Sequence, residues 1–423
     1  MTVTASPATS CCDEYAGMSR RGLIRGAALL GATATFGSAV VTTSARPAAA
    51  SWGAPARGTL VLLSLRGAAD GLNIVVPHGD PAYYAARPRI NVPKDTLLER
   101  DDFFGLHPGL KALQPMWRSG KLAAIHATGM PAPNRSHFFA MEEIEDADPG
   151  SSARTGWLNR FLGLDSNTSP LQGMHVGGGV PPTSMYGPHQ VMSARAASAV
   201  KLAGDDQYAV NDGRRRSLQK LWNRDMSLLG RNVRSSFAAI DAFEPVLGVA
   251  EGPRNGATYP RSDLGTALGE VARILRGNVG VEAVTVDQGD WDMHTDMGNM
   301  SWGRMKANVT ELGDAIAAFF TDLGPLADNV TLVTLSEFGR RVKENSSWGT
   351  DHGYGNVMFV AGAGVKGGKY YGRWPGLQNS LDADLTVTTD YRSVLSEVLR
   401  RRFDTSTSAV FPGFQPEDVG FMA

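Results

Sequence analysis

The 423-residue chain has only two cysteines, Cys11 and Cys12, and both precede the paired arginines Arg20 and Arg21. If this N-terminal segment is removed, no cysteine remains in the chain. A mature protein without cysteine can use neither disulfides nor a thiol nucleophile, nor an aldehyde derived from cysteine.

An excess of charge of one sign is also missing, because 41 basic residues face 42 acidic residues and the formal net charge is -1. This balance gives no reason to expect nucleic acid or an anionic membrane as a partner. The basic run in 212–225 is interpreted as a solvated helix face. With 42% hydrophobic residues, the chain is long and apolar enough to bury a substantial core.

Long apolar runs are lacking as well, and the N-terminus fits an export signal better than a membrane anchor. The sequence Ser-Arg-Arg-Gly-Leu-Ile-Arg at 19–25 precedes a weakly apolar stretch at 26–41 and three alanines at 48–50. This order is typical of a twin-arginine signal with a cleavage site of small residues. We therefore predict that residues 1–50 are cleaved and that the twin-arginine machinery exports the protein to the periplasm, the cell envelope or the medium. The apolar stretch is too short to span a membrane comfortably, so no span is expected in the mature form.

The rest of the chain, 58–423, is predicted to be a single α/β domain. Apolar runs of strand length alternate with helical patterns, which favours a largely parallel sheet. The runs lie at 59–65, 122–126, 281–286, 330–335 and 357–360, and helices are expected at 108–119, after 136 and within 212–243. The alternation of strand and helix patterns is interrupted in the stretch 163–260, which is interpreted as a cap-like insertion over the sheet.

Acidic residues and histidines lie beside these runs, at positions where a parallel sheet gathers ligands. Asp70 follows the first run, Asp292 and His294 follow the run at 281–286, Glu337 follows 330–335, and His352 precedes the run at 357–360. Carboxylates and imidazoles that converge at one crevice are suitable ligands for a divalent metal ion. The alternatives are a surface loop with solvated acids for 287–294 and a simple turn for Asp70, while Asp290 is a further candidate ligand.

The segment around Ser136 has a catalytic interpretation and a structural one. A serine at a helix start is usually an N-cap, but a hydroxyl there, close to a metal ion, can act as a nucleophile. His137 is interpreted as a metal ligand or a base, because a serine precedes it, and the alternative is a buried histidine of the helix. Arg135 or Arg340 is interpreted as the group that binds an oxyanion. A buried Glu337 needs a cation, which Arg340 or Arg341 could supply without any metal.

No nucleotide cofactor is expected. The sequence Gly-Ala-Gly-Val-Lys-Gly at 362–367 fits G-x-G-x-x-G, but the following residues do not have the helical pattern that the dinucleotide fingerprint requires.

Taken together, these motifs resemble the DUF1501 family of exported bacterial proteins. The resemblance is carried, in chain order, by the paired arginines, LVLLSLRGAADGLN, PNRSHFFAME, DQGDWDMH, LSEFGRR and GTDHGYGNVMFVAGAGVKGG. It implies a relationship to the alkaline phosphatase and sulfatase superfamily. The fold implied is a doubly wound, mostly parallel sheet with helices on both faces and a partly helical insertion.

The resemblance also implies a reaction, the hydrolysis of phosphate or sulfate esters of small molecules or polymers with one or two divalent metal ions. Zinc, calcium, magnesium and manganese all suit such a site. The implied metal ligands are Asp70, Asp292, His294, Glu337 and His352, and the implied nucleophile is Ser136. Two departures from the family and superfamily patterns favour a single ion: Asp290 adds an acid, and Phe338 stands where phosphatases have a histidine. The alternative is a non-catalytic exported protein that retains the fold for binding or assembly.

Overall fold

A computed structural model describes residues 34–36, 39–42, 56–149, 151, 154–164, 168–202 and 213–423. The paired arginines and the predicted cleavage sequence at 48–50 lie outside these residues. Within them, no helix is both long and apolar enough to cross a membrane.

The described chain is built on one large mixed sheet, in the order β1-β2-β8-β7-β9-β3-β10-β11-β6-β12, and β13 also pairs with β6. The five adjacent strands from β8 to β10 are parallel, whereas β11 is antiparallel to both of its neighbours. The strands of this sheet are β1 (Ala34–Phe36), β2 (Ala39–Val41), β3 (Thr59–Leu65), β6 (Leu122–Gly129), β7 (Gly173–Val176), β8 (Met192–Ala194), β9 (Ala283–Gln288), β10 (Val330–Leu335), β11 (Asn356–Gly362), β12 (Tyr370–Tyr371) and β13 (Thr389–Asp390). A small separate sheet pairs β4 (Val75–Val76) with β5 (Gly105–Leu106).

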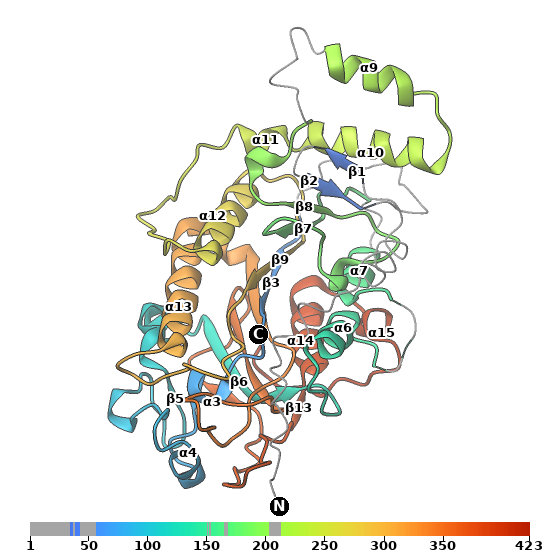
Figure 1. The fold of residues 1–423 in the computed structure, drawn as a ribbon. Helices are drawn as coiled ribbons and strands as arrows, with labels where there is room; N and C mark the ends of the chain where they lie inside the picture. Colours follow the sequence, from blue (N-terminus) through green and yellow to red (C-terminus); the bar gives the residue numbers. More distant parts are fainter. Residues whose placement is uncertain are drawn as a thin grey trace, which may run out of the picture.

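Helices cover both faces of the sheet, as expected for a central strand that is buried throughout (Figure 1). All seven residues of β3 are buried, and alternate residues belong to different hydrophobic clusters. One cluster contains α12 (Asp263–Arg276), α13 (Arg304–Leu323), η2 (Pro108–Leu113) and α5 (Gln114–Arg118). The other contains α6 (His137–Asp146), α7 (Trp157–Leu162), α14 (Tyr391–Phe403) and α15 (Thr407–Val410).

Shorter elements connect these layers. They are α3 (Gly71–Ile74), α4 (Pro81–Ala86), η1 (Lys94–Thr96), η3 (Thr183–Met185), η4 (Ala197–Ala199), α11 (Glu244–Leu247) and η5 (Gly324–Asn329). The expected strands at 59–65 and 330–335 have the observed bounds of β3 and β10. The helix expected at 108–119 is divided instead into η2 and α5, because Pro115 lacks an amide hydrogen and lies in the first turn of the new helix.

Part of the predicted signal region lies on the sheet. β1 and β2 form an antiparallel hairpin, and β2 pairs with β8, where Val40 faces Ser193. Ala39 and Val41 are buried in the main core. Cleavage near residue 50 would therefore take this hairpin away and leave the edge of β8 uncovered.

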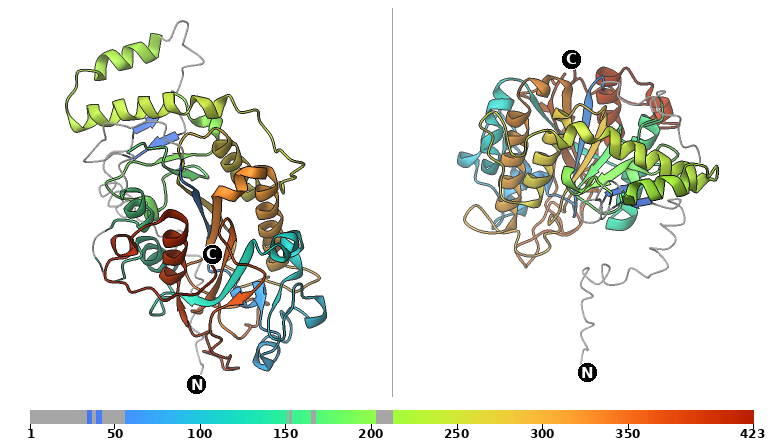
Figure 2. Two further views of the ribbon diagram at one scale, coloured as in Figure 1. Left: turned by 180° about the vertical axis from the view of Figure 1, so that it is seen from behind. Right: turned by 90° about the horizontal axis from the view of Figure 1, so that it is seen from above.

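The stretch 163–260 extends the sheet as well as covering its end. β7 and β8 both come from this stretch and continue the parallel order from β9, so they are not an insertion above the sheet. The remaining part forms α9 (Gly213–Trp222), α10 (Leu228–Ala242) and α11, which lie near the outer edge formed by β1 and β2 (Figures 1 and 2). β7 pairs with β9, and β8 pairs in turn with β7, so the backbone groups of each strand complete the ladder of its neighbour.

Candidate metal centre

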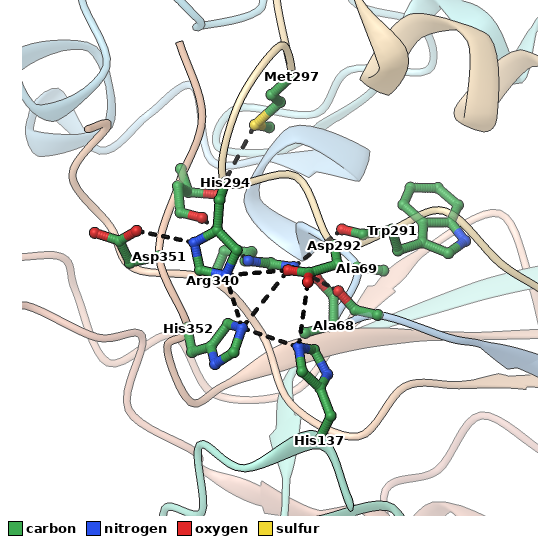
Figure 3. A network of polar contacts seen from close by, with 12 residues as sticks. Ala68, Ala69, His137, Trp291, Asp292, His294, Met297, Arg340, Asp351 and His352 are labelled. Atoms are coloured by element: carbon green, nitrogen blue, oxygen red, sulfur yellow. Dashed lines mark hydrogen bonds and ion pairs between the residues drawn. The ribbon is translucent and has the colours of Figure 1, made fainter. Parts of the chain in front are cut away.

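The loops that follow β3, β9 and β10 meet at one end of the sheet. Close packing of backbone holds them together, since Gly67 lies against the peptide that joins Trp291 to Asp292. Gly67 has a φ of +109°, and a Cβ atom there would lie 2.5 Å from the Asp292 nitrogen. Only glycine fits this combination of conformation and contact. The residues before β11 and the start of α6 complete the site (Figure 3).

Three imidazoles and one carboxylate point toward one another at this place (Figure 3). The Nε2 atom of His352 lies 2.9 Å from the Nε2 atoms of both His137 and His294. Asp292 Oδ1 lies 3.1 Å from His294 Nε2 and 3.6 Å from His352 Nε2, and Asp292 Oδ2 lies 3.7 Å from His137 Nε2. Ligand atoms bonded at tetrahedral angles to one zinc ion are separated by about 3.3 Å.

Each imidazole is fixed from behind through its other nitrogen. The Nδ1 partners are Glu337 Oε1 at 2.9 Å for His137, Asp351 Oδ1 at 3.0 Å for His294, and the Arg135 carbonyl oxygen at 2.8 Å for His352. Metal-binding histidines commonly donate their second N–H in this way, which turns the free Nε2 lone pair toward the ion.

This donor set fits a cation. A carbonyl oxygen can only accept a hydrogen bond, so Nδ1 of His352 carries a hydrogen and Nε2 of neutral His352 presents a lone pair. If His137 and His294 also donate from Nδ1, their Nε2 lone pairs face that of His352 at 2.9 Å. Such an arrangement is repulsive unless protons or a metal ion lie between the nitrogens. Among the described residues, the ligand atoms of His137, Asp292 and His352 all lie within 4.8 Å of one another, and His294 adjoins this set.

In the metal-free protein, protons bound to His137 and His294 reduce this repulsion between the imidazole nitrogens. Burial lowers the pKa of His137, but hydrogen bonds with Asp292 and Glu337 outweigh it and raise the pKa to about 9. The hydrogen bond with Asp292 also raises the pKa of His294. Burial raises the pKa of Asp292, yet its bonds to the three histidines and Arg340 hold that pKa far below the usual value. A metal ion must therefore displace bound protons.

Glu337 was predicted as a metal ligand, but the structure places it behind His137. Its Oε1 accepts from His137 and from the Gly67 amide, each at 2.9 Å, and its Oε2 accepts from Ser336 Oγ at 3.1 Å. The carboxylate is buried and faces the Nδ1 side of the ring, away from the nitrogen that points into the site. Burial raises its pKa, but its hydrogen bonds and the charge of His137 together outweigh burial and lower it, so Glu337 is an anion that orients His137.

Arg340 was predicted to bind a substrate oxyanion, and its contacts argue against that role. The side chain is fully buried, and all three guanidinium nitrogens are occupied by groups of the protein. Its acceptors are the carbonyl oxygens of Ala68, Thr350, Gly67 and Trp291 and the Oδ1 atom of Asp292. Arg340 therefore holds the loops and Asp292 in place.

Arg135, the other candidate for oxyanion binding, acts through its backbone at this site. Its carbonyl accepts from His352, while its guanidinium pairs with Asp384. The side chain is thus directed to another part of the surface by an acidic residue that sequence spacing does not reveal.

Asp70 lies outside the group of converging side chains. Its Oδ2 pairs with Arg87 Nη1 at 2.6 Å, and its Oδ1 caps α3 through the Leu72 amide at 3.1 Å. Both members of the ion pair are buried, and Arg87 also donates to Asn73. The predicted role as a ligand is corrected because the carboxylate is already neutralised and hydrogen-bonded elsewhere.

Ser136 occupies the N-cap position of α6, directly before His137. Its side chain does not cap the helix, and its amide donates to Asn134 Oδ1 at 3.1 Å. The helix start therefore positions both the hydroxyl and the imidazole that follows it.

A cleft of about 520 Å³ opens beside the converging groups, and His137, Asp292 and Glu337 line it. Phe138 and Met141 contribute apolar surface, and the described lining also has two cations that the sequence analysis missed, Arg66 and Arg304. Arg66 directly follows β3, and this position at a strand end could have identified it as a residue of the site. Ser136 is not among the lining residues found in the described chain.

Comparison with known proteins fixes the family. The family model described as "Protein of unknown function (DUF1501)" matches residues 57–397. The chain belongs to the DUF1501 family. No curated protein matches the sequence.

Solved structures resemble this DUF1501 protein only distantly. They include the lipoteichoic acid synthase LtaP from Listeria monocytogenes, with 9% identity, a TM-score of 0.33, and coverage of 82% of this chain and 73% of that one. The periplasmic domain of EcEptC from Escherichia coli, in complex with Zn, has 10% identity, a TM-score of 0.32, and coverage of 78% and 77%. The PsFucS1 sulfatase from Pseudoalteromonas sp. has 10% identity, a TM-score of 0.33, and coverage of 86% and 73%. Similarity at this level carries no weight for the chemistry of the DUF1501 site.

Two isosteric variants separate a metal ligand from a structural carboxylate. We expect Asp292→Asn to lose most bound zinc or manganese, because a charged ligand oxygen is removed from the three imidazoles. Asp70→Asn should keep the wild-type metal content but unfold more easily, by up to about 3 kcal/mol, because Arg87 keeps a buried charge without its partner. Elemental analysis and thermal unfolding measure the two effects. Loss of metal from Asp70→Asn at unchanged stability would restore Asp70 as a ligand.

Arg340→Lys tests whether the buried guanidinium positions the site. One ammonium cannot replace hydrogen bonds from three nitrogens, so we expect the free energy of unfolding to fall by about 3 kcal/mol or more. Metal affinity should fall by roughly 10- to 100-fold, as for other groups that orient ligands. Arg341→Lys is the matched control, because the neighbouring side chain pairs with Asp382 and Asp384 at the surface. Equal effects of the two variants in unfolding and metal titrations would contradict this role.

Proposed function

We propose that this protein is an exported, metal-dependent hydrolase of phosphate or sulfate esters. The observation that carries the proposal is the convergence of His137, Asp292 and His352, with His294 beside them, at a cleft large enough for a small ester or the end of a polymer. His137 and Asp292 themselves line the cleft, so a substrate oxygen can approach the ligand set. The export signal supports the location and remains a prediction.

A divalent ion held by these residues would polarise an ester oxygen and lower the pKa of a nearby hydroxyl. The protein's own contribution includes two cations in the cleft. Arg66 is held by Glu145 at 2.7 Å and Asp287 at 3.2 Å, and Arg304 donates to the backbone of Asp290 and Asp292. These contacts hold both guanidinium groups in place before an anionic ester enters.

Ser136 is the proposed nucleophile. Its hydroxyl is not used for capping, it precedes the candidate ligand His137, and it stands at the start of a ten-residue helix. The serine oxygen would attack phosphorus or sulfur, the bond to the alcohol would break, and water would then release phosphate or sulfate from the serine ester. The helix N-terminus would stabilise negative charge that develops on the transferred group.

A screen of aryl phosphate and aryl sulfate esters against the metal-loaded protein tests the activity. We expect turnover with at least one ester class and a loss of about 10³-fold or more in kcat for Ser136→Ala, because the attacking oxygen is removed. Ser119→Ala is the control, since Ser119 is an exposed serine that follows α5. Full activity of Ser136→Ala would show that another oxygen attacks, and no turnover with any ester and metal would exclude the hydrolase.

The second candidate is a non-catalytic exported binding or assembly protein. The specific observation in its favour is His294, whose Nε2 lies close enough to Asp292 and His352 to complete a four-coordinate site. Structural zinc sites are commonly closed by four protein ligands, whereas catalytic sites keep one position open. In that case metal removal would lower stability, and no ester would be turned over.

Metal affinity should depend on pH in a defined direction. Because the pKa of His137 is raised to about 9 in the metal-free protein, the ion competes with a proton at neutral pH. Lowering the pH therefore weakens metal binding, by about 10-fold per pH unit for each proton displaced. Competition titrations with a chelator between pH 6 and pH 8 measure this. An affinity that stays constant over that range would contradict the protonated metal-free site.

A further inference from the structure

The helical hairpin formed by α9 and α10 stands at the outer edge of the molecule. α9 packs on α10 through a small cluster separate from the main core, in which Leu218 and Trp222 contact Leu202, Val233 and Phe237. Figures 1 and 2 show α9 projecting beyond the body of the protein, with α10 lying over β1 and β2. The tip of the hairpin is the turn between the two helices, 223–227.

This hairpin is strongly basic in a chain that is almost neutral. Residues 213–242 carry seven basic residues and two acidic residues, a formal charge of +5, although the whole chain has a net charge of -1. The basic residues are Arg214, Arg215, Arg216, Lys220, Arg224, Arg231 and Arg234, and the acidic ones are Asp225 and Asp241, of which Asp241 pairs with Arg215. The overall charge balance therefore hides a concentrated positive surface.

Large apolar side chains are exposed at the same tip. Leu221 is 67% exposed, Met226 71%, Leu228 44% and Leu229 46%. They come from the end of α9, the turn and the start of α10. Exposed cations lie beside them, including Lys220, Arg224 and Arg231. A solvated helix face, as the sequence alone suggested, would not gather these four apolar residues.

We propose that the α9–α10 hairpin docks the protein onto an anionic lipid surface. Leu221, Met226, Leu228 and Leu229 would enter the boundary between headgroups and acyl chains, and the surrounding cations would face lipid phosphates. Apolar residues flanked by lysine and arginine are the composition of helices that bind in the plane of a membrane interface. The cations alone would also suit nucleic acid, but phosphate contacts give no reason to expose four large apolar side chains.

The docking surface is separate from the candidate metal centre. The metal centre lies at the ends of β3, β9 and β10, whereas the hairpin lies by β1 and β2, beyond β7 and β8 in the sheet order. Docking is therefore expected to leave the cleft open, and the inference does not depend on the proposed hydrolase activity.

Vesicle co-sedimentation of the purified full chain tests the proposal. We expect binding to vesicles of phosphatidylglycerol and phosphatidylcholine to be at least about 10-fold tighter than to phosphatidylcholine alone, because each cation near an anionic surface adds attraction. The preference should weaken as salt screens these charges. Equal binding to both vesicle types at low salt would overturn the electrostatic part.

Two variants locate the surface. A variant with Leu221, Met226, Leu228 and Leu229 all changed to Ser should bind every vesicle at least about 10-fold more weakly, because apolar burial is lost. R224E/R231E should lose a similar factor on anionic vesicles and little on neutral ones. The control K94E/K111E makes the same charge change at exposed lysines elsewhere. All proteins carry the same N-terminal segment, so its own lipid affinity cancels in the comparison.

Circular dichroism and thermal unfolding show whether each variant keeps its fold. Wild-type vesicle binding by a folded serine variant would overturn the proposal. Tighter binding of the hairpin to nucleic acid than to anionic vesicles would also overturn it. A third contrary result is a stable dimer, seen by light scattering, that the serine variant abolishes.

Discussion

A single buried guanidinium, that of Arg340, joins the loops that follow β3 and β9 to the segment before β11. It donates to carbonyl oxygens on both sides of the site and to the carboxylate of Asp292. A charge in this position is tolerated only because every nitrogen has an acceptor. Its backbone also forms an isolated bridge with His352, so one residue fixes the positions of two candidate ligands.

The same interaction sets the electrostatics of the site. Arg340 stabilises the charged form of Asp292, and Asp292 in turn raises the pKa of His137 and His294. The carboxylate is thus shared between a permanent cation and three imidazoles. Its negative charge remains available to a metal ion at all physiological pH values, while protons must leave His137 and His294 before the ion can bind.

The sequence predicted the sheet better than it predicted the roles of individual polar residues. Apolar runs such as 59–65 and 330–335 identify buried strands because their side chains face helices on both sides. The clustering of Asp292, His294 and His352 follows from positions next to strand ends. Neither argument depends on the partner of any one side chain.

The corrected residues share one physical cause. Asp70, Glu337, Arg135 and Arg340 all have the charge that their predicted roles required, but other groups of the protein already use that charge. The partner of Asp70 is Arg87, 17 positions away, and the acceptors of Arg340 are mostly backbone carbonyls. Every residue has a backbone carbonyl, so no sequence pattern predicts which carbonyls accept hydrogen bonds from Arg340.

The position of His294 connects the geometry to the choice between catalysis and structure. The ligand atoms of His137, Asp292 and His352 form a mutually close set, and His294 approaches it from the side of His352 and Asp351. Its side chain is 27% exposed, compared with 15% for His137 and 13% for His352. A less buried ligand loses less packing when it moves away from the ion. An ion held by the other three would then keep the open position that hydrolysis requires, whereas an ion held by all four would be closed to substrate.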